Sequence, residues 1–595
     1  MKLAAPRASR APAPTGARGP SCSPDSARGA GRWLLAGVSI WAVAACTSLP
    51  GPPIATPWLA DGNGCHAWVA ALDAAVARAS VADAEAARLA GVPGLRVDRP
   101  LQALRERAGE GGDAWRAWLR HAAALDRQAR VAEIGNLPAA ALPIVVLGDS
   151  ADSGGAAGAA GTASPGAADR AADRAAALAR TDGCREDLLR QLEAAPAPLH
   201  AEVLARAEVP ERYSTGLRAA GLYPLLRWPF FAGVQRWQAA HEAEMVRWAA
   251  ATPPLQRYVS AEEGAPSAPP APSVPSAPVV PAASPAPVAP VAPEAPEAPS
   301  AAAIPRDALG MPQPAPPLAR RLLAWHAPVF EIEERGAFDR FGVPTWSGRD
   351  AVAPRVDTAQ PVVYTRLAHT RFEGRWRLQL VYTLWFPERP ARSSLDPLAG
   401  TLDGVIVRLT LDDDGEPLLM DTIHACGCYH LFFPSAALQA RAGAPQSEEW
   451  LFAPGALPRP VGRDARLVVR LASGSHYVTG VAALPRRASA AEGGAGTREG
   501  QGARRYALRD ENALRSLPLA DAPAERRSLY GPDGLVAGSE RGERFLFWPM
   551  GIASAGAMRQ WGHHATAFVG RRHFDDVDLV EQRFVRAAAP SRPQP

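Results

Sequence analysis

A proline-rich tract at residues 261–317 limits what this chain can fold into more than any other feature of its sequence. Proline, alanine, serine and valine dominate the tract, with repeats such as Val-Ala-Pro-Val-Ala-Pro at 288–293. Proline has no backbone N–H and a fixed φ, so such a tract forms neither a helix interior nor a central strand. The sequence therefore predicts a disordered linker between two folded parts, on the order of 150 Å long in polyproline geometry.

The segment before the linker has the residue spacing of helices. It is rich in alanine, leucine and arginine, and apolar residues recur at helical intervals, as at Trp68, Leu72 and Val76. We expect an α-helical domain over 61–260. A run of Gly and Ala near 150–170 predicts a disordered insert within that domain.

The segment after the linker changes to short strands. Candidate strands lie at 361–367, 376–386, 404–411, 418–423, 467–471 and 476–481. The Asp-Asp-Asp-Gly run at 412–415 is typical of a hairpin turn, because glycine tolerates positive φ. We expect a β-rich domain over 318–595 with a disordered loop near 487–503. The fold class predicted for the whole chain is α+β multidomain, with a helical N-terminal domain and a β-rich C-terminal domain.

Residues 1–45 have the pattern of a lipoprotein signal peptide. Arg28 and Arg32 precede the apolar run at 33–45, which is too short to span a bilayer and leads into the sequence Val-Ala-Ala-Cys. The pattern predicts cleavage before Cys46 and acylation of that cysteine with palmitate-type chains. A signal peptide cut at the same place with an incidental cysteine is the alternative. The long leader leaves the true start codon open.

The acylated cysteine would anchor the chain to a membrane. Each buried methylene contributes about 0.8 kcal/mol, so two or three acyl chains attach the protein firmly. Residues 46–60 would form the membrane-proximal tether, and Thr47, in place of an aspartate, indicates the outer membrane with the chain facing the periplasm. The lipid membrane is therefore the first partner that the sequence predicts.

The charge of the chain argues against nucleic-acid binding. The formal net charge is +4, but residues 1–45 hold six basic residues and one aspartate, so removing their +5 leaves the mature chain at −1. No basic run remains to attract a polyanion. Lys2 is the only lysine, which excludes Schiff-base chemistry and a phosphate-binding P-loop in the mature chain.

The four cysteines that follow Cys46 form two pairs. Cys65 and Cys184 both follow a glycine in turn-like surroundings at the edges of helical segments. In the oxidising periplasm we expect them to form a disulfide. Closing so long a loop would stabilise the fold by about 4 to 5 kcal/mol in the chain-entropy model. Cys426 and Cys428 then have only each other.

The segment His-Ala-Cys-Gly-Cys-Tyr-His at 424–430 concentrates reactive side chains. Thiolate and neutral imidazole are ligands that zinc and other transition metals prefer, and a thiol beside an imidazole is also an activated nucleophile. An extended strand would separate the first and last of these residues by roughly 20 Å, so we expect only a subset to bind one metal. Candidate metal ligands in this segment are His424, Cys426, Cys428 and His430.

A second cluster at 562–576 supplies the remaining candidates. Three histidines, His563, His564 and His573, lie there together with two aspartates. Asp575 is predicted to act as a base or to orient a ligating imidazole through its second nitrogen. Any of the three histidines is expected to complete the ligand set.

Three interpretations of Cys426 and Cys428 remain open. In the first, the two cysteines belong to a metal site. In the second, they are structural, either as buried thiols or as a strained disulfide. In the third, Cys428 is a catalytic thiolate that His430 or His564 activates, and Arg571 or backbone amides receive an oxyanion. The sequence contains no HExxH, no nucleophile elbow and no pair of CxxC motifs, which argues against the zincin, hydrolase and zinc-ribbon classes.

Two further segments have open roles. The aromatic run at 221–231 either packs inside the helical domain or rests in a membrane interface, where tryptophan and tyrosine are enriched. The aromatic strand end at 385–389 either lines a pocket with Asp403 or belongs to the core, with Asp403 in a turn.

Three blocks of the sequence resemble a family of proteobacterial lipoproteins. They are residues 213–237, the segment from 379 through the HxCGCYH motif at 424–430, and the block GAMRQWGHHATAFVGRRHFDD at 556–576. The resemblance covers both folded parts. It implies an envelope lipoprotein and the location of its site, and it implies no activity.

The function that we predict from the sequence is a membrane-anchored periplasmic lipoprotein with a Cys/His metal site. Such a protein would be a metal-dependent hydrolase of the cell envelope, with Cys428, His430 and His564 as ligands of zinc or another transition metal, and peptidoglycan or envelope proteins as partners. A cysteine-dependent acyl transferase on peptidoglycan is one alternative. A non-enzymatic assembly or scaffold lipoprotein with structural cysteines is the other, so the sequence does not decide whether the protein is an enzyme.

Overall fold

The computed structural model describes residues 64–143, 167–250, 253–262, 304–443, 445, 447–486 and 502–588. The chain divides into two compact units, Met1–Leu49 and Pro50–Pro595, and every described residue belongs to the second. The predicted signal peptide, Cys46 and the tether lie outside the described residues. So do most of the predicted linker, insert and loop, at 263–303, 150–166 and 487–501. Within the described chain, no helix has the length and apolarity needed to cross a membrane.

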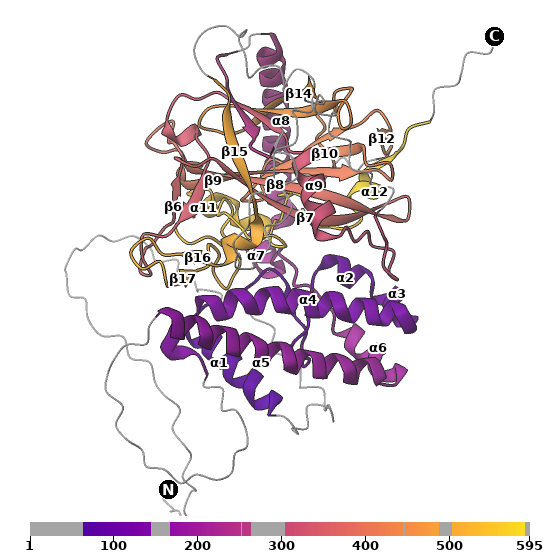
Figure 1. Cartoon of the computed structure of the whole chain (residues 1–595). Coiled ribbons are helices and arrows are strands. Elements are labelled where there is room, and N and C mark those ends of the chain that lie inside the picture. Colours follow the sequence, from indigo (N-terminus) through magenta and orange to yellow (C-terminus); the bar gives the residue numbers. More distant parts are fainter. Residues whose placement is uncertain are drawn as a thin grey trace, which may run out of the picture. The chain divides into compact units, whose positions relative to one another are not determined.

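The fold is a mixed α+β structure, as the sequence predicts. Helices dominate the N-terminal half and a large curled sheet forms the C-terminal part (Figure 1). The N-terminal helices are α1 (Cys65–Arg78), α2 (Arg99–Ala103), α3 (Arg105–Gly109), α4 (Gly112–Asn136), α5 (Ala167–Ala194) and α6 (Ala197–Ala205). The face of α4 that carries Trp115, Trp118 and Leu119 is fully buried, which explains how an alanine-rich sequence holds these helices together.

The predicted disulfide is present. Cys65 at the start of α1 is joined to Cys184 in α5 across 119 residues of sequence. Around it, Trp68, Leu72 and Val76 of α1 pack into one apolar cluster, which confirms the helical spacing of these residues. The bridge therefore ties the first helix to the longest one of this region.

The main sheet has ten strands, most of them antiparallel. In spatial order they are β11 (Leu431–Pro434), β10 (Pro417–His424), β9 (Gly400–Leu411), β8 (Arg375–Arg389), β7 (Val362–Phe372), β15 (Arg504–Asp510), β3 (Gln256–Ser260), β4 (Val329–Ile332), β13 (Ala465–Leu471) and β14 (Val478–Pro485). The six strands predicted from sequence correspond to β7, β8, β9, β10, β13 and β14. The hairpin between β9 and β10 turns at Gly415, whose φ of 85° fits the predicted turn.

Both faces of the central strands are buried, so each face has a core of its own. Along β8, Leu380, Tyr382 and Leu384 belong to one apolar cluster, whereas Val381 and Trp385 belong to another. This is the alternation that a strand imposes on its side chains. It explains why β8 reads as a nearly continuous apolar run in the sequence.

The two predicted domains share elements. Strand β3, which the sequence assigns to the helical domain, pairs with β4 and β15 inside the sheet. In the predicted linker, Leu309 and Met311 are buried in the core of the helical region, and α9 (Pro316–Trp325) begins there. Residue 260 is therefore inside a strand of the sheet, and Pro50–Pro595 forms one compact unit.

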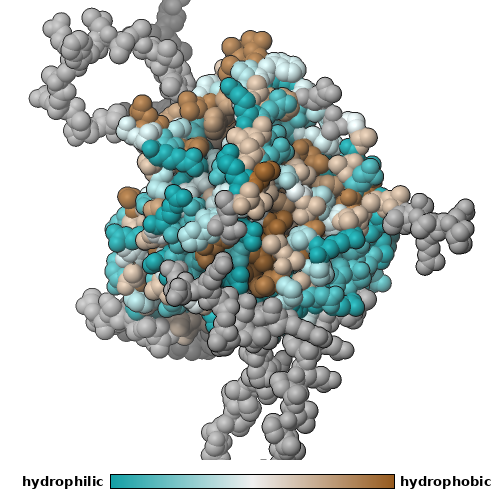
Figure 2. Space-filling model, turned by 90° about the horizontal axis from the view of Figure 1, so that it is seen from above, coloured by the Kyte–Doolittle hydropathy of each residue, from teal (hydrophilic) through white to brown (hydrophobic). Residues whose placement is uncertain are grey.

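Two further helices and a short turn lie beside the sheet. They are α7 (Thr215–Ala220), α8 (Tyr223–Ala250) and the turn formed by α11 (Arg544–Phe547) with the 3₁₀ segment Trp548–Met550. Helix α8 contacts the sheet through His241, whose Nε2 lies 3.0 Å from the carbonyl of Val478. The face drawn in Figure 2 shows hydrophilic and hydrophobic residues interspersed.

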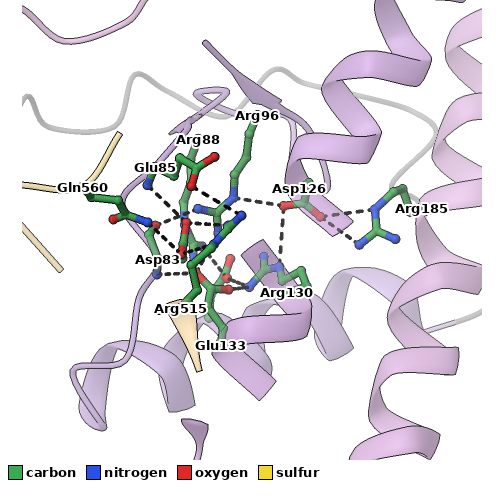
Figure 3. A network of polar contacts seen from close by, with 11 residues as sticks. Asp83, Glu85, Arg88, Arg96, Asp126, Arg130, Glu133, Arg185, Arg515 and Gln560 are labelled. Carbon is green, nitrogen blue, oxygen red and sulfur yellow. Dashed lines mark hydrogen bonds and ion pairs between the residues drawn. The ribbon is translucent and has the colours of Figure 1, made fainter. Parts of the chain in front are cut away.

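A buried ionic network links the helices to the C-terminal part (Figure 3). Glu133 of α4 binds Arg96 at 2.7 Å and Arg130 at 3.1 Å. Nearby, Arg515 donates two hydrogen bonds of 2.8 Å to Asp83. Because Asp83 and Arg515 lie 432 positions apart in the sequence, their ion pair fixes the helical region against the C-terminal part.

Candidate functional site

The segment at 424–430 is a tight turn and not an extended strand. Strand β10 ends at His424, whose N–H donates to the carbonyl of Cys428 at 2.9 Å, while the N–H of Gly427 donates back to the carbonyl of His424 at 2.7 Å. Gly427 has a φ of 92°, and a Cβ there would lie 2.6 Å from the Ala565 carbonyl oxygen. The turn breaks the alternation of side chains, so these residues do not share one face.

His424 lies in a buried polar cluster centred on Asp403. Its Nδ1 is 3.5 Å from Asp403 Oδ1, which is close enough for an ion pair but long for a hydrogen bond. Neither ring nitrogen has a hydrogen-bond partner among the described residues. His476 Nδ1 lies 2.8 Å and Arg541 Nη2 lies 3.0 Å from the same carboxylate. Burial alone would raise the pKa of Asp403, but Arg541 and His424 hold it well below its usual range. Asp403 is therefore a buried carboxylate and not a surface turn residue.

Backbone strain gathers at this Asp403 cluster. Leu402, Tyr429 and His476 have φ values of 62°, 60° and 52°, in the left-handed region that residues other than glycine rarely adopt. Each such conformation costs on the order of 1 to 3 kcal/mol and persists only where the surroundings enforce it. Leu402 precedes Asp403, His476 binds it, and the Tyr429 ring lies 5.0 Å from the His424 ring. Strain of this kind concentrates at functional sites.

The two thiols lie on the other side of the turn. Both cysteines are free, and Cys426 is buried whereas Cys428 is partly exposed. The Cys428 Sγ lies 4.0 Å from Glu543 Oε1. Contact with Cys426 and burial raise the pKa of Cys428 well above its usual range, so its resting form is the neutral thiol. Burial also raises the pKa of Glu543.

Two arginines complete the surroundings of the thiols. Arg559 is fully enclosed, and its Nε donates to the carbonyl of Cys426 at 3.1 Å. The Nη2 of Arg541 binds Asp403 at 3.0 Å. The positive charges of Arg541 and Arg559 would stabilise a thiolate that forms here.

His430 does not activate Cys428, contrary to the sequence-based hypothesis. Its Nε2 donates to Asp421 Oδ2 at 2.9 Å, and its ring stacks on Phe432. Burial lowers the pKa of His430 to about 3, although Asp421 opposes this shift. Asp421 in turn pairs with Arg408 on the opposite face of the sheet from His424. His430 is a buried neutral residue that helps to hold the strands.

The histidines of the second cluster are dispersed. His563 Nε2 lies 2.7 Å from the carbonyl of Ala84 in the helical region, and His573 Nε2 lies 2.7 Å from Glu211. His564 is buried, and burial together with Arg559 holds its pKa well below the usual range. His563 and His573 therefore have their partners away from the two thiols.

Asp575 is also directed elsewhere. Its Oδ1 lies 3.1 Å from Arg99 Nε at the start of α2, where it joins the two regions of the fold. Asp575 thus forms an ion pair between the two regions, and its role as a base or as the partner of a ligating imidazole stays a prediction.

The candidate ligands do not fit a metal centre in this arrangement. All seven lie in the described part of the chain, and within that part no group of three or more His, Cys, Asp and Glu side chains is placed to hold a metal ion. The physical reason is the turn at Gly427, which directs His424 to the Asp403 cluster, Cys428 to Glu543 and His430 to Asp421.

Sequence reasoning missed four residues of the site. Glu543, Arg541, His476 and Arg559 lie on loops between about 46 and 135 positions away from the thiol segment, and no short motif links them to it. Their only advance signal was the presence of Asp403 as a candidate pocket residue.

No family model, no curated protein and no solved structure matches this chain. The site must therefore be interpreted from its own geometry.

Proposed function

We propose that this protein is a lipid-anchored envelope protein, facing the periplasm from the outer membrane, that carries out thiol–disulfide exchange with other proteins. The observation that supports this proposal is the pair of free thiols at Cys426 and Cys428, one buried and one partly exposed, held on a turn beside the carboxyl group of Glu543. The sequence pattern at Cys46 supports the anchor.

The first step would use Cys428 as the attacking group. Its proton passes to Glu543, whose raised pKa makes it a stronger base than an ordinary carboxylate. The Cys428 sulfur then bonds to one sulfur of a partner disulfide, that disulfide breaks, and the departing sulfur takes up the proton. Arg559 and Arg541 stabilise the thiolate that exists in between.

The second step would release the partner. The Cys426 sulfur attacks Cys428, the mixed disulfide breaks, and the second partner sulfur leaves with the Cys426 proton. Two electrons have then passed from the Cys426/Cys428 pair to the partner, and the reverse sequence oxidises a partner dithiol. No metal takes part in either step.

The test is the redox state of the native protein in glutathione buffers. Alkylation and mass spectrometry should show Cys426 and Cys428 changing state together, while Cys65 and Cys184 remain joined. The Cys426→Ser variant should accumulate a mixed disulfide between Cys428 and glutathione, because the second step is blocked. Thiols that stay reduced in fully oxidising buffer would contradict the proposal and support the scaffold alternative.

A second candidate function is acyl transfer by Cys428, with peptidoglycan as the substrate class. The 4.0 Å contact between Cys428 Sγ and Glu543 favours it, because a carboxylate can replace the imidazole of an activated thiol. The same Cys426→Ser variant separates the two functions. If acyl transfer is the activity, an activated ester should still acylate Cys428 in this variant. If thiol–disulfide exchange is the activity, the variant should no longer turn over disulfide substrates.

The anchor has a test of its own. Labelled palmitate should enter the wild-type protein in cells, and the Cys46→Ser variant should carry no label and leave the membrane fraction. A labelled Cys46→Ser chain would contradict the assignment.

A further inference from the structure

Seven large apolar side chains are exposed where the start of α8 meets α11. Their exposed fractions run from 37% to 70%, and they are Leu222, Leu225, Leu226, Trp228, Phe545, Leu546 and Trp548. We call this set the apolar patch. A soluble surface carries scattered residues of this kind, but a cluster of seven marks an interaction site.

The two segments of the apolar patch are held side by side. The rings of Phe230 and Phe547 meet edge to face at 5.5 Å, and Arg218 of α7 donates to the carbonyl of Met550 at 2.9 Å. Phe547 also contacts Phe568 at 4.8 Å. One side of each segment is thus packed into the fold, which leaves the other side as a fixed apolar surface.

The first turns of α8 carry apolar side chains that the fold does not cover. Leu225 and Trp228 stand three positions apart, the spacing at which a helix presents side chains on one face, and Leu222, with a φ of 50°, lies just before the helix. Here that face is exposed. The packing role that the sequence allowed for residues 221–231 therefore accounts for the phenylalanines and not for these leucines and Trp228.

Arginines accompany the aromatic residues of the patch. The Arg227 guanidinium lies 5.0 Å from the Trp228 ring and the Arg544 guanidinium lies 4.8 Å from the Phe545 ring. Leucine, tryptophan and phenylalanine beside arginine is the composition of a surface that lies in a lipid headgroup region, with the cations toward anionic phosphates.

We propose that the apolar patch docks onto the surface of a lipid bilayer. The inference rests on the proposed acylation of Cys46, which lies 18 positions before Gly64, the first described residue. A chain of that length spans at most roughly 65 Å, so an anchored body stays within reach of the membrane. Glu543 directly precedes α11, so docking also brings the thiol site close to the headgroups.

The experiment uses the chain from Thr47 onward, which lacks the leader and the acylated cysteine but contains the whole compact unit Pro50–Pro595. It is floated with vesicles of phosphatidylcholine alone and with vesicles containing phosphatidylglycerol. The double variant Leu225→Gln/Phe545→Gln should lower the bound fraction at least tenfold. The matched control is Val352→Gln/Leu395→Gln, which removes two apolar side chains that are 85% and 88% exposed outside the patch, and should bind as the parent does.

Three outcomes would overturn docking. The first is that the parent chain does not float with either kind of vesicle. The second is that the control variant loses as much binding as the patch variant. The third is that the parent chain sediments as a dimer, which the patch variant dissociates, and does not bind vesicles. The last result would assign the patch to a second copy of the chain. Palmitate label on Cys46 together with absent flotation would leave the anchor standing and remove the docking surface alone.

Discussion

The helical region and the thiol turn each contain a cysteine pair and a buried carboxylate held by arginine, but the cysteine pairs are in opposite states. In the helical region Cys65 and Cys184 are joined, and Glu133 is bound by three arginines (Figure 3). At the turn the thiols are free, and neither nitrogen of the His424 ring has a hydrogen-bond partner among the described residues. The first arrangement serves stability, whereas strain and unsatisfied groups mark the second as a site.

Replacing each cysteine pair should give the largest contrast. The double variant Cys65→Ser/Cys184→Ser opens a loop of 119 residues and should lower the free energy of unfolding by up to about 5 kcal/mol. The double variant Cys426→Ala/Cys428→Ala removes no cross-link and should cost about 1 kcal/mol. Denaturant unfolding of both variants measures the difference, and equal losses would erase the distinction between the two pairs.

Breaking the ionic network comes next. Glu133→Ala takes one carboxylate partner from the buried Arg96 and Arg130, which keep Asp126, and we expect a loss of about 3 kcal/mol. The matched change, Glu110→Ala, breaks an exposed pair with Arg107 and should cost less than about 1 kcal/mol. Chemical unfolding decides, and a small loss at Glu133 would mean that the network does not stabilise the helical region.

Acid should weaken the sheet before it weakens the network. The pKa of Glu133 is lowered to about 2, because its arginine partners outweigh burial, so the network stays ionised until the pH falls through that value. Burial lowers the pKa of His430 to about 3, below the ordinary 6.5, so below pH 6.5 the unfolded chain takes up a proton that the folded chain resists. His430 should therefore remove about 1.4 kcal/mol of stability per pH unit on acidification.

The measurement for this prediction is the slope of the melting temperature against pH between 7.5 and 4.5. His430→Gln should flatten the slope even if it lowers the melting temperature at pH 7.5. The exposed His66→Gln variant serves as control and should leave the slope unchanged. Hydrogen exchange at pH 5 should show β10 and β11 opening before α4. The reverse order would contradict the prediction.

Much of the fold but only part of the site could be predicted from the sequence, because local patterns determine helices and strands whereas the site is assembled from distant residues. The alternation in β8 and the helical spacing of Trp68, Leu72 and Val76 are local, and both were predicted. The thiol segment was found because its residues adjoin one another. The sequence predicted that only a subset of these residues could bind together, but not where each side chain would go, because Gly427 turns the chain and Glu543 and His476 reach the site only through the tertiary fold.

Glu543→Gln should have the smallest effect on stability and a clear effect on reactivity. Glu543 is almost fully buried and burial raises its pKa, so an amide of the same shape removes an unfavourable charge and should change the free energy of unfolding by less than about 0.5 kcal/mol. If Glu543 accepts the Cys428 proton, the rate at which oxidised glutathione modifies Cys428 at pH 7 should fall by a factor of at least about 100. Glu540→Gln makes the same charge change at an exposed position three residues earlier and should leave that rate unaltered. A Glu543→Gln variant that unfolds readily while keeping its thiol reactivity would place Glu543 with Glu133, among the residues that hold the fold together.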